Sequence, residues 1–118
     1  MGHELRFYET EEGSCQVRGY LRSQNKKVRG HAGWLLTRLE GEAHELDRPI
    51  VGHLGDGIHE LRVIVDRQQH RLLFFYHHKT IVVTSAFLKK SDKVPPMEIG
   101  RAMRARADWL RREEERKL

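Results

Sequence analysis

The chain has 118 residues, of which 38% are hydrophobic and 33% are charged, and its formal net charge at pH 7 is +5. This length supports one ordinary hydrophobic core, so we expect a single domain over residues 1–118, and the composition excludes a disordered chain. The longest apolar run, residues 72–76, is too short to cross a membrane, and acidic residues near the start do not fit a secretory signal.

Cysteine usage and charge distribution narrow the possible partners. Cys15 is the one cysteine, and no Cys and His spacing is that of a zinc site, so we expect a cytoplasmic protein without a metal or other cofactor. Residues 58–118 carry 14 Lys and Arg against 8 Asp and Glu, whereas residues 1–57 carry 8 against 9. This bias favours a polyanion such as nucleic acid. The alternative is a basic surface that only limits aggregation.

The N-terminal half predicts an edge strand and two helices. Residues 5–8 alternate as a strand does, and Ser14 is a candidate N-cap for a helix over residues 15–24. After a polar connection at residues 25–27, apolar residues recur at offsets of three and four: Val28, Ala32, Leu35, Leu36, Leu39, Ala43 and Leu46. The two helices are expected to form a hairpin that packs on one face of a sheet.

A glycine-rich segment then leads into the strands. Pro49 ends the helical region, and the glycines at positions 52, 55 and 57 predict a connecting loop. Their spacing is not that of a phosphate-binding P-loop, because no Lys-Ser or Lys-Thr pair follows.

Three strands are predicted at residues 58–65, 70–76 and 80–88. A turn of two or four residues between the first two strands would place Arg62 and Arg71 on one open face, and an odd loop would reverse this. The opposite face carries the apolar core: Leu61, Val63, Val65, Leu72, Phe74 and Tyr76. The third strand alternates too weakly for its faces to be assigned.

Pro95 and Pro96 predict the start of a final helix, since proline is tolerated in the first turn. Its expected apolar stripe comprises Ile99, Ala102, Met103, Ala107 and Leu110. The resulting order, β-α-α-β-β-β-α, predicts a small α+β domain with an antiparallel-rich sheet.

Three short sequence segments, taken in their order along the chain, resemble motifs of a known protein family. They are Asp56-Gly57-Ile58-His59-Glu60-Leu61-Arg62, Arg71-Leu72-Leu73-Phe74-Phe75, and Phe87-Leu88-Lys89-Lys90 with Pro95-Pro96 and a basic helix after it. Together with the order of elements, they resemble the RelE/HigB superfamily of toxins, and most closely its phage-derived HigB-like branch. The resemblance implies a RelE-like fold and a type II toxin–antitoxin system. It also implies an mRNA interferase that cleaves mRNA in the ribosomal A site and is neutralised by a HigA-like helix-turn-helix antitoxin.

The implied chemistry is metal-independent attack of a ribose 2′-hydroxyl on the neighbouring phosphodiester. Such a reaction needs cations that stabilise the phosphorane-like transition state and groups that move protons. Arg62 and Arg71 match basic positions of the family, and Lys89 or Lys90 matches the basic residue after its last strand, so all four are candidates. Glu60 is the candidate base, because strand parity places it beside the arginines. Three further residues would extend the RNA-binding surface: Lys93, Arg101 and Arg104.

Each assignment has a structural alternative. Arg62 could form an ion pair with Glu60 or Asp66, and the two lysines could protect an exposed sheet edge from aggregation. His59 and His70 lie near the basic cluster in sequence but are expected to face the opposite side of the sheet. Trp34 and Trp109 could stack on bases or pack internally.

The last helix carries neither the tyrosine nor the histidine that some family members place there, so the general acid is unassigned. A non-catalytic nucleic-acid or partner-binding module on the same fold is therefore the alternative function. A DNA-binding regulator is less well supported, because no recognition helix follows a tight helix-turn-helix turn.

Overall fold

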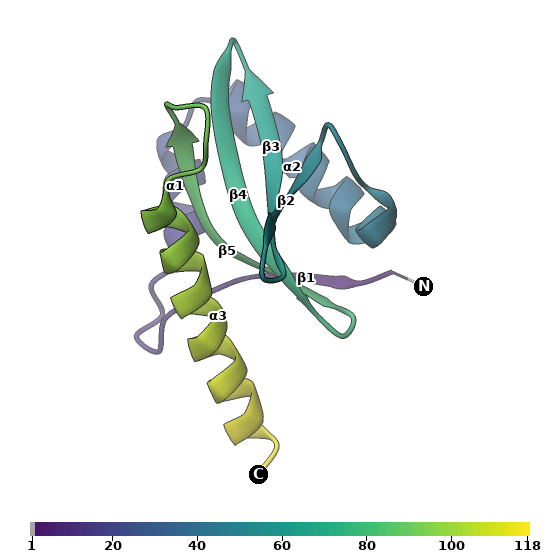
Figure 1. The fold of residues 1–118 in the computed structure, drawn as a ribbon, viewed down its shortest axis with the longest axis vertical. Helices are drawn as coiled ribbons and strands as arrows, with labels where there is room; N and C mark the ends of the chain where they lie inside the picture. The colour runs from purple at the N-terminus through teal and green to yellow at the C-terminus, as the bar shows by residue number, and fades with distance from the viewer. Residues whose placement is uncertain (1) are drawn as a thin grey trace.

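The computed structural model describes residues 2–118 and shows a mixed α+β fold around one five-stranded sheet (Figure 1). Its strands are β1 (Glu4–Phe7), β2 (Val51–Gly55), β3 (Ile58–Val65), β4 (Gln68–His77) and β5 (Thr80–Lys89). Its helices are α1 (Gln16–Ser23), α2 (Lys26–Glu42) and α3 (Pro96–Arg116), with a 3-10 turn, η1, at Ala43–Glu45. The strand order is β1-β5-β4-β3-β2, antiparallel except for the parallel edge pair β1 and β5. None of the helices in residues 2–118 is long and apolar enough to cross a membrane.

The predicted loop after Pro49 is wrong, because residues 51–55 form the edge strand β2, paired with β3. Glycine disfavours a strand interior, which is why the sequence suggested a loop. The reason for glycine here is steric: a Cβ at Gly52 would lie 2.6 Å from Nη2 of Arg62 and 2.7 Å from Oε2 of Glu60. The strand therefore forms around two large polar side chains that occupy the space above Gly52.

The hairpin between β3 and β4 has a two-residue loop, Asp66 and Arg67, and Val65 pairs with Gln68. Both loop residues have positive φ, 50° and 68°, as the tight turns that match strand twist require. The expected parity is confirmed, because Arg62 pairs directly with Arg71. The next turn, at residues 78–79, also has two residues, since His77 pairs with Thr80.

The weak alternation of the last strand is explained by a β-bulge. Leu73 pairs with Ser85, but Phe74 pairs with Val83, so Thr84 is an extra residue in β5. Residues on either side of Thr84 therefore follow opposite parity, and no single period-two pattern describes the strand.

Helices cover both faces of the sheet. Helices α1 and α2 pack on the face that carries Leu61, Val63 and Phe74, and the predicted apolar stripe of α2 is buried there. The second face is not open, as the sequence suggested, because α3 packs against Leu73 and Phe75. Figure 1 shows α3, in green to yellow, on the opposite side of the sheet from α2.

Two helix starts differ from expectation. Cys15, not Ser14, is the N-cap residue of α1, and it makes no side-chain capping bond. Asn25 belongs to a cap rather than to a connection of three residues: its Oδ1 accepts a hydrogen bond from the Val28 amide at 2.9 Å, and α2 begins at Lys26.

Helix α3 begins at Pro96, as predicted, but part of its buried stripe differs. Met103 and Ala107 are exposed, whereas Ala105 is buried and Trp109 packs on the core with Ile99 and Leu110. The stripe predicted from the apolar residues alone is slightly rotated around the helix axis relative to the stripe that is buried in the structure. The helix ends at Arg116.

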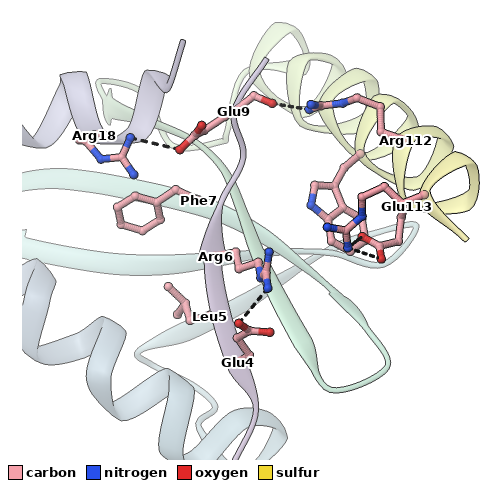
Figure 2. Close-up of a pocket in the computed structure, with 10 residues that line it drawn as sticks. Glu4, Leu5, Arg6, Phe7, Glu9, Arg18, Arg112 and Glu113 are labelled. Atoms are coloured by element: carbon pink, nitrogen blue, oxygen red, sulfur yellow. Dashed lines mark hydrogen bonds and ion pairs between the residues drawn. The ribbon is translucent and has the colours of Figure 1, made fainter. Parts of the chain in front are cut away.

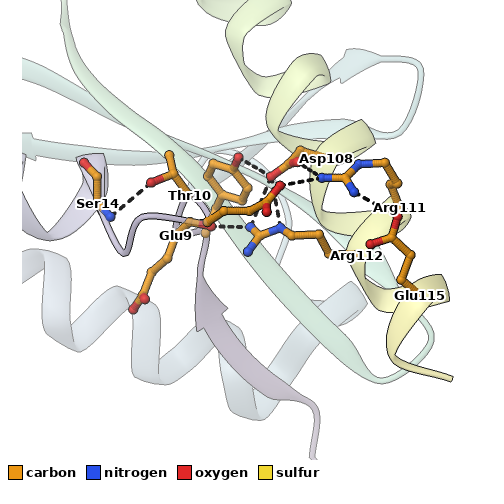
Figure 3. A network of polar contacts seen from close by, with 9 residues as sticks. Glu9, Thr10, Ser14, Asp108, Arg111, Arg112 and Glu115 are labelled. Atoms are coloured by element: carbon orange, nitrogen blue, oxygen red, sulfur yellow. Dashed lines mark hydrogen bonds and ion pairs between the residues drawn. The ribbon is translucent and has the colours of Figure 1, made fainter. Parts of the chain in front are cut away.

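A polar network holds the segment after β1 against α3 (Figure 3). The Tyr8 hydroxyl donates to Oδ2 of Asp108 at 2.6 Å, and Arg111 bridges Asp108 and Glu11 at 2.8 and 2.9 Å. Arg112 also donates to Asp108, at 3.1 Å, and to the carbonyl of Glu9. The contacts join residues about a hundred positions apart and fix the path of the chain from β1 to α1.

Candidate functional site

A hollow of about 320 Å³ lies on the sheet, between side chains of β3 and β5 and the segment at residues 92–94 that precedes α3. Its lining residues are Leu54, Glu60, Arg62, Lys89, Asp92, Lys93, Val94 and Ile99. Four of the residues predicted from sequence therefore meet here: Glu60, Arg62, Lys89 and Lys93. Three cationic and two acidic side chains share the lining, so the hollow, which we call the basic hollow, carries a positive excess.

The sheet supplies this site through rows of side chains on the face toward α3. Direct pairing across strands puts Arg62, Arg71 and Phe87 in one row, and Ile64, Gln69 and Lys89 in the next. Directly paired side chains lie about 5 Å apart, and successive rows on one face lie about 7 Å apart. The basic residues are therefore close because of strand register, although they are far apart in sequence.

The bulge at Thr84 decides which face Lys89 occupies. Val82 faces α3 before the bulge, so uninterrupted alternation would put residues 84, 86 and 88 on that face. The extra residue shifts the parity, and Lys89 joins the row beside Arg62 and Arg71. Sequence alternation alone would have placed Lys89 among the residues packed under α2.

Glu60 is a buried ion-pair partner of both arginines. Only 7% of its side chain is exposed, and its two oxygens bind Nε of Arg71 at 2.8 Å and Nη2 of Arg62 at 3.2 Å. This is the alternative foreseen for Arg62, whereas Asp66 binds Lys27 instead. Each carboxylate oxygen has two lone-pair sites, so one ion pair on each oxygen leaves Glu60 with acceptor sites free.

Arg71 lies beneath the hollow rather than in its lining. Its side chain is 5% exposed, and it donates to Glu60, to the carbonyl of His70 at 3.1 Å and to Oε1 of Gln69 at 3.2 Å. Every nitrogen of the guanidinium is thus engaged. The structure makes Arg71 a support for Glu60 and Gln69, without direct access to a ligand in the hollow.

Arg62 keeps unused donor capacity. Its Nη1 donates to the Pro49 carbonyl at 3.2 Å and its Nη2 to Glu60, but its buried Nε has no partner within residues 2–118. A buried unpaired donor is costly and suggests an absent acceptor. With Lys89 and Lys93 nearby, an anionic oxygen is the acceptor that the charge of the site favours.

The other basic residues predicted from sequence lie outside this lining. Lys90 follows the end of β5 and is exposed. Arg101 and Arg104 are exposed on α3, and Arg101 pairs with Glu98 at 3.5 Å. These residues can extend a basic surface around the hollow, but they do not form it.

The two histidines considered from sequence face away from the hollow, as parity predicted. His59 contacts Phe74 and Tyr76, and burial, followed by the nearby His53 and His44, lowers its pKa. His70 is buried, its Nδ1 lies 2.6 Å from the Tyr20 hydroxyl, and burial lowers its pKa as well. Neither imidazole can serve a ligand in the basic hollow.

The tryptophans are also remote from this lining. Trp109 packs against Phe75 and His77, whereas Trp34 is 57% exposed on α2, on the other side of the sheet. Sequence reasoning missed the apolar wall of the hollow, formed by Leu54, Val94 and Ile99. It also missed Gly52, because the segment around it shows no regular alternation that would have indicated a strand.

A larger hollow, about 630 Å³, lies between β1 and the C-terminal half of α3 (Figure 2). Its four arginines are already paired: Arg6 with Glu4, Arg18 with Glu9, Arg116 with Glu113, and Arg112 with Asp108. It therefore offers less free positive charge than the basic hollow. Across residues 2–118, no three His, Cys, Asp or Glu side chains are grouped to hold a metal ion.

Comparison with known families identifies the family of this chain. Residues 19–107 match the family described as phage derived protein Gp49-like (DUF891). The matched region runs from α1 into α3 and contains every residue that lines the basic hollow. No curated protein sequence matches the chain.

Proposed function

We propose a function for this chain from the premise that it belongs to the Gp49-like family, which is a RelE-like toxin family. The proposed function is that of a ribosome-dependent mRNA endonuclease. In this proposal it has the RelE-like fold of the HigB-like branch and is the toxin of a type II toxin–antitoxin system. A HigA-like helix-turn-helix antitoxin would neutralise it, and its substrate would be mRNA in the A site of cytoplasmic ribosomes.

The observation that carries the proposal is the cationic lining of the basic hollow. Arg62, Lys89 and Lys93 converge there from β3, β5 and the segment before α3, and Nε of Arg62 has no partner in the described chain. A phosphodiester supplies the anionic oxygens that such a site would bind. The basic residues around it, Lys90, Arg101 and Arg104, would hold the flanking RNA or ribosomal RNA.

The proposed reaction needs no metal ion. The 2′-oxygen of a ribose forms a bond to the adjacent phosphorus, the bond from phosphorus to the 5′-oxygen breaks, and the products carry a 2′,3′-cyclic phosphate and a 5′-hydroxyl. Negative charge increases on the phosphoryl oxygens in the transition state. Arg62 and Lys89 would stabilise that charge, which is the electrostatic contribution that preorganised cations make.

Glu60 and Arg71 have supporting roles in this mechanism. Their buried pair fixes the position of Arg62, because the second oxygen of Glu60 binds the Arg62 guanidinium. Glu60 could act as the base through an oxygen lone pair that the two guanidinium groups leave free. The leaving 5′-oxygen would take its proton from Lys89, Lys93 or water.

Two observations favour the alternative, a non-catalytic RNA-binding module on the same fold. Both oxygens of Glu60 are engaged in ion pairs, and the hollow contains no histidine or tyrosine within the described residues. Such a protein would bind RNA through the same cations without cutting it.

The test is induced expression of the natural chain and of Arg62→Ala, with growth measured and mRNA 5′ ends mapped. Arg62→Ala is preferable to Arg71→Ala because Arg71 is buried and its loss would affect folding. Lys26→Ala, on the exposed side of α2, is the charge-matched control. Growth arrest with new 5′ ends inside translated codons, lost in Arg62→Ala and kept in the control, supports the proposal. Soluble natural protein that neither arrests growth nor produces new ends would overturn it.

A further inference from the structure

The row of side chains beside Arg62 differs in chemistry from the basic hollow. It contains Ile64 on β3, Gln69 on β4 and Lys89 on β5, which are paired directly across the three strands. Lys89 belongs both to this row and to the lining of the hollow. The row therefore begins where an anion would bind and continues onto a surface that α3 leaves uncovered.

Ile64 is an exposed apolar residue on this surface. Its exposed fraction is 49%, whereas Leu73 and Phe75, farther along the same face, are buried under α3. Ile64 stands two positions from Arg62 on one strand, so their side chains are separated by about 7 Å on the same face. An apolar side chain beside a phosphate-binding cation suits the flat face of an unstacked nucleobase.

Gln69 is oriented by the buried network. Its Oε1 accepts a hydrogen bond from Nη2 of Arg71 at 3.2 Å. Because a guanidinium can only donate, the amide oxygen must face Arg71, and the amide Nε2 is directed elsewhere. Nε2 is not among the buried unpaired atoms and has no partner within residues 2–118, so it is available at the surface as a donor.

We propose that Ile64 and Gln69 form a nucleobase subsite beside the basic hollow, selective for a base that presents a carbonyl at its O6 or O4 position, guanine or uracil. The proposal rests on the proposed RNA substrate and specifies which base it prefers. Ile64 contacts the face of the base and Nε2 of Gln69 donates to its carbonyl oxygen. Arg71 is the positioning residue that fixes the direction of the amide.

The fixed amide also disfavours adenine. Glutamine recognises adenine by donating to one ring nitrogen and accepting from the exocyclic amino group. Here Oε1 is already bound to Arg71, so it is not directed at the amino group, and where Nε2 meets that amino group two donors oppose each other. The same argument disfavours the amino edge of cytosine.

The decisive substitution is Gln69→Glu, with Gln68→Glu as the matched control. A glutamate at position 69 keeps the acceptor for Arg71 but replaces the outward donor by an acceptor. Gln68 is the neighbouring residue on the opposite face, where its Oε1 lies 3.3 Å from Nε2 of His70. Both variants add the same negative charge at adjacent positions, so a general electrostatic loss of RNA binding appears in both.

The first readout is binding of short uridine and adenosine oligonucleotides, measured by fluorescence anisotropy. We expect the ratio of uridine to adenosine affinity to fall by about threefold to tenfold in Gln69→Glu relative to Gln68→Glu, as expected for one hydrogen bond. Ile64→Ser should weaken both oligonucleotides alike. Equal ratios in the two glutamate variants, with both folded, would overturn the subsite.

The second readout is the base composition at mapped cuts in cells that express each protein. A shift away from guanine and uracil in Gln69→Glu alone supports the subsite. If the natural chain makes no cuts, the proposed cleavage fails, while the binding ratios still decide the nucleobase subsite. If cuts occur but composition and ratios do not depend on Gln69, the subsite fails and the proposed function stands.

Discussion

Glu60 and Arg71 form a buried ion pair at the centre of the sheet, with 2.8 Å between Oε1 and Nε and at most 7% of either side chain exposed. Both residues were expected to contact substrate. In the structure Glu60 lies in the lining of the basic hollow and Arg71 lies beneath it, and Glu60 orients Arg62 while Arg71 orients Gln69.

Breaking this pair on one side should destabilise the fold. Arg71→Met leaves the Glu60 carboxylate buried with one partner, and we expect a loss of about 3 to 5 kcal/mol in the free energy of unfolding. The double variant Glu60→Leu/Arg71→Met should recover much of that loss, since the buried carboxylate is removed together with Arg71 and only Arg62, whose side chain is 29% exposed, loses an ion pair. Urea denaturation of the single and double variants measures both effects, and additive losses would contradict this account.

Gly52→Ala should disturb the site because its Cβ would lie 2.6 Å from Nη2 of Arg62. We expect destabilisation of about 1 to 3 kcal/mol, together with weaker RNA binding as Arg62 is displaced. Gly33→Ala is the control: it lies within α2, its Cβ would meet no atom within 4 Å, and it should stabilise by about 0.5 to 1 kcal/mol. Thermal unfolding and RNA titration of both variants test the prediction, which fails if Gly52→Ala matches the natural chain in both.

Lys89 and Lys90 should differ in their effects on RNA binding, although they are adjacent in sequence. Lys89 lines the basic hollow, whereas Lys90 is exposed beyond the end of β5. We expect Lys89→Ala to reduce the slope of log affinity against log salt by about one, and Lys90→Ala to reduce it by less. Titrations at several salt concentrations provide the slopes, and a larger reduction for Lys90→Ala would show that the bulge does not direct Lys89 into the site.

Stability should fall on mild acidification because His70 is buried in its neutral form. Burial lowers its pKa from the ordinary value of 6.5, so between the folded-state pKa and 6.5 the unfolded chain binds more protons than the folded one. The contribution of neutral His70 to the free energy of unfolding is complete above pH 6.5 and is lost as the pH falls below that value. His59 and His77 have lowered pKa values through burial as well and act in the same direction.

The measurement is the free energy of unfolding between about pH 5 and 7.5, for the natural chain and for His70→Gln. We expect a smaller decrease at low pH in the variant, whatever its stability at neutral pH. An unchanged pH dependence would show that His70 is protonated equally in the folded and unfolded states.

The sequence by itself determined the elements whose own side chains repeat with a regular period. The stripe of α2, the limits of β3 and the start of α3 at Pro96 are local properties, because each depends on residues a few positions apart. The common face of Arg62 and Arg71 was also predictable, since a two-residue turn and period-two alternation fix strand parity.

Only the tertiary structure decided what those side chains contact. The strand β2 exists because Gly52 leaves space for Glu60 and Arg62, and no local pattern shows that requirement. The bulge at Thr84 directs Lys89 toward the hollow, and α3 buries a face that alternation had suggested was open. These outcomes depend on packing between residues that are distant in sequence. For the same reason, only the folded chain shows that Arg71 supports the site and that Arg62 is the candidate ligand-binding residue.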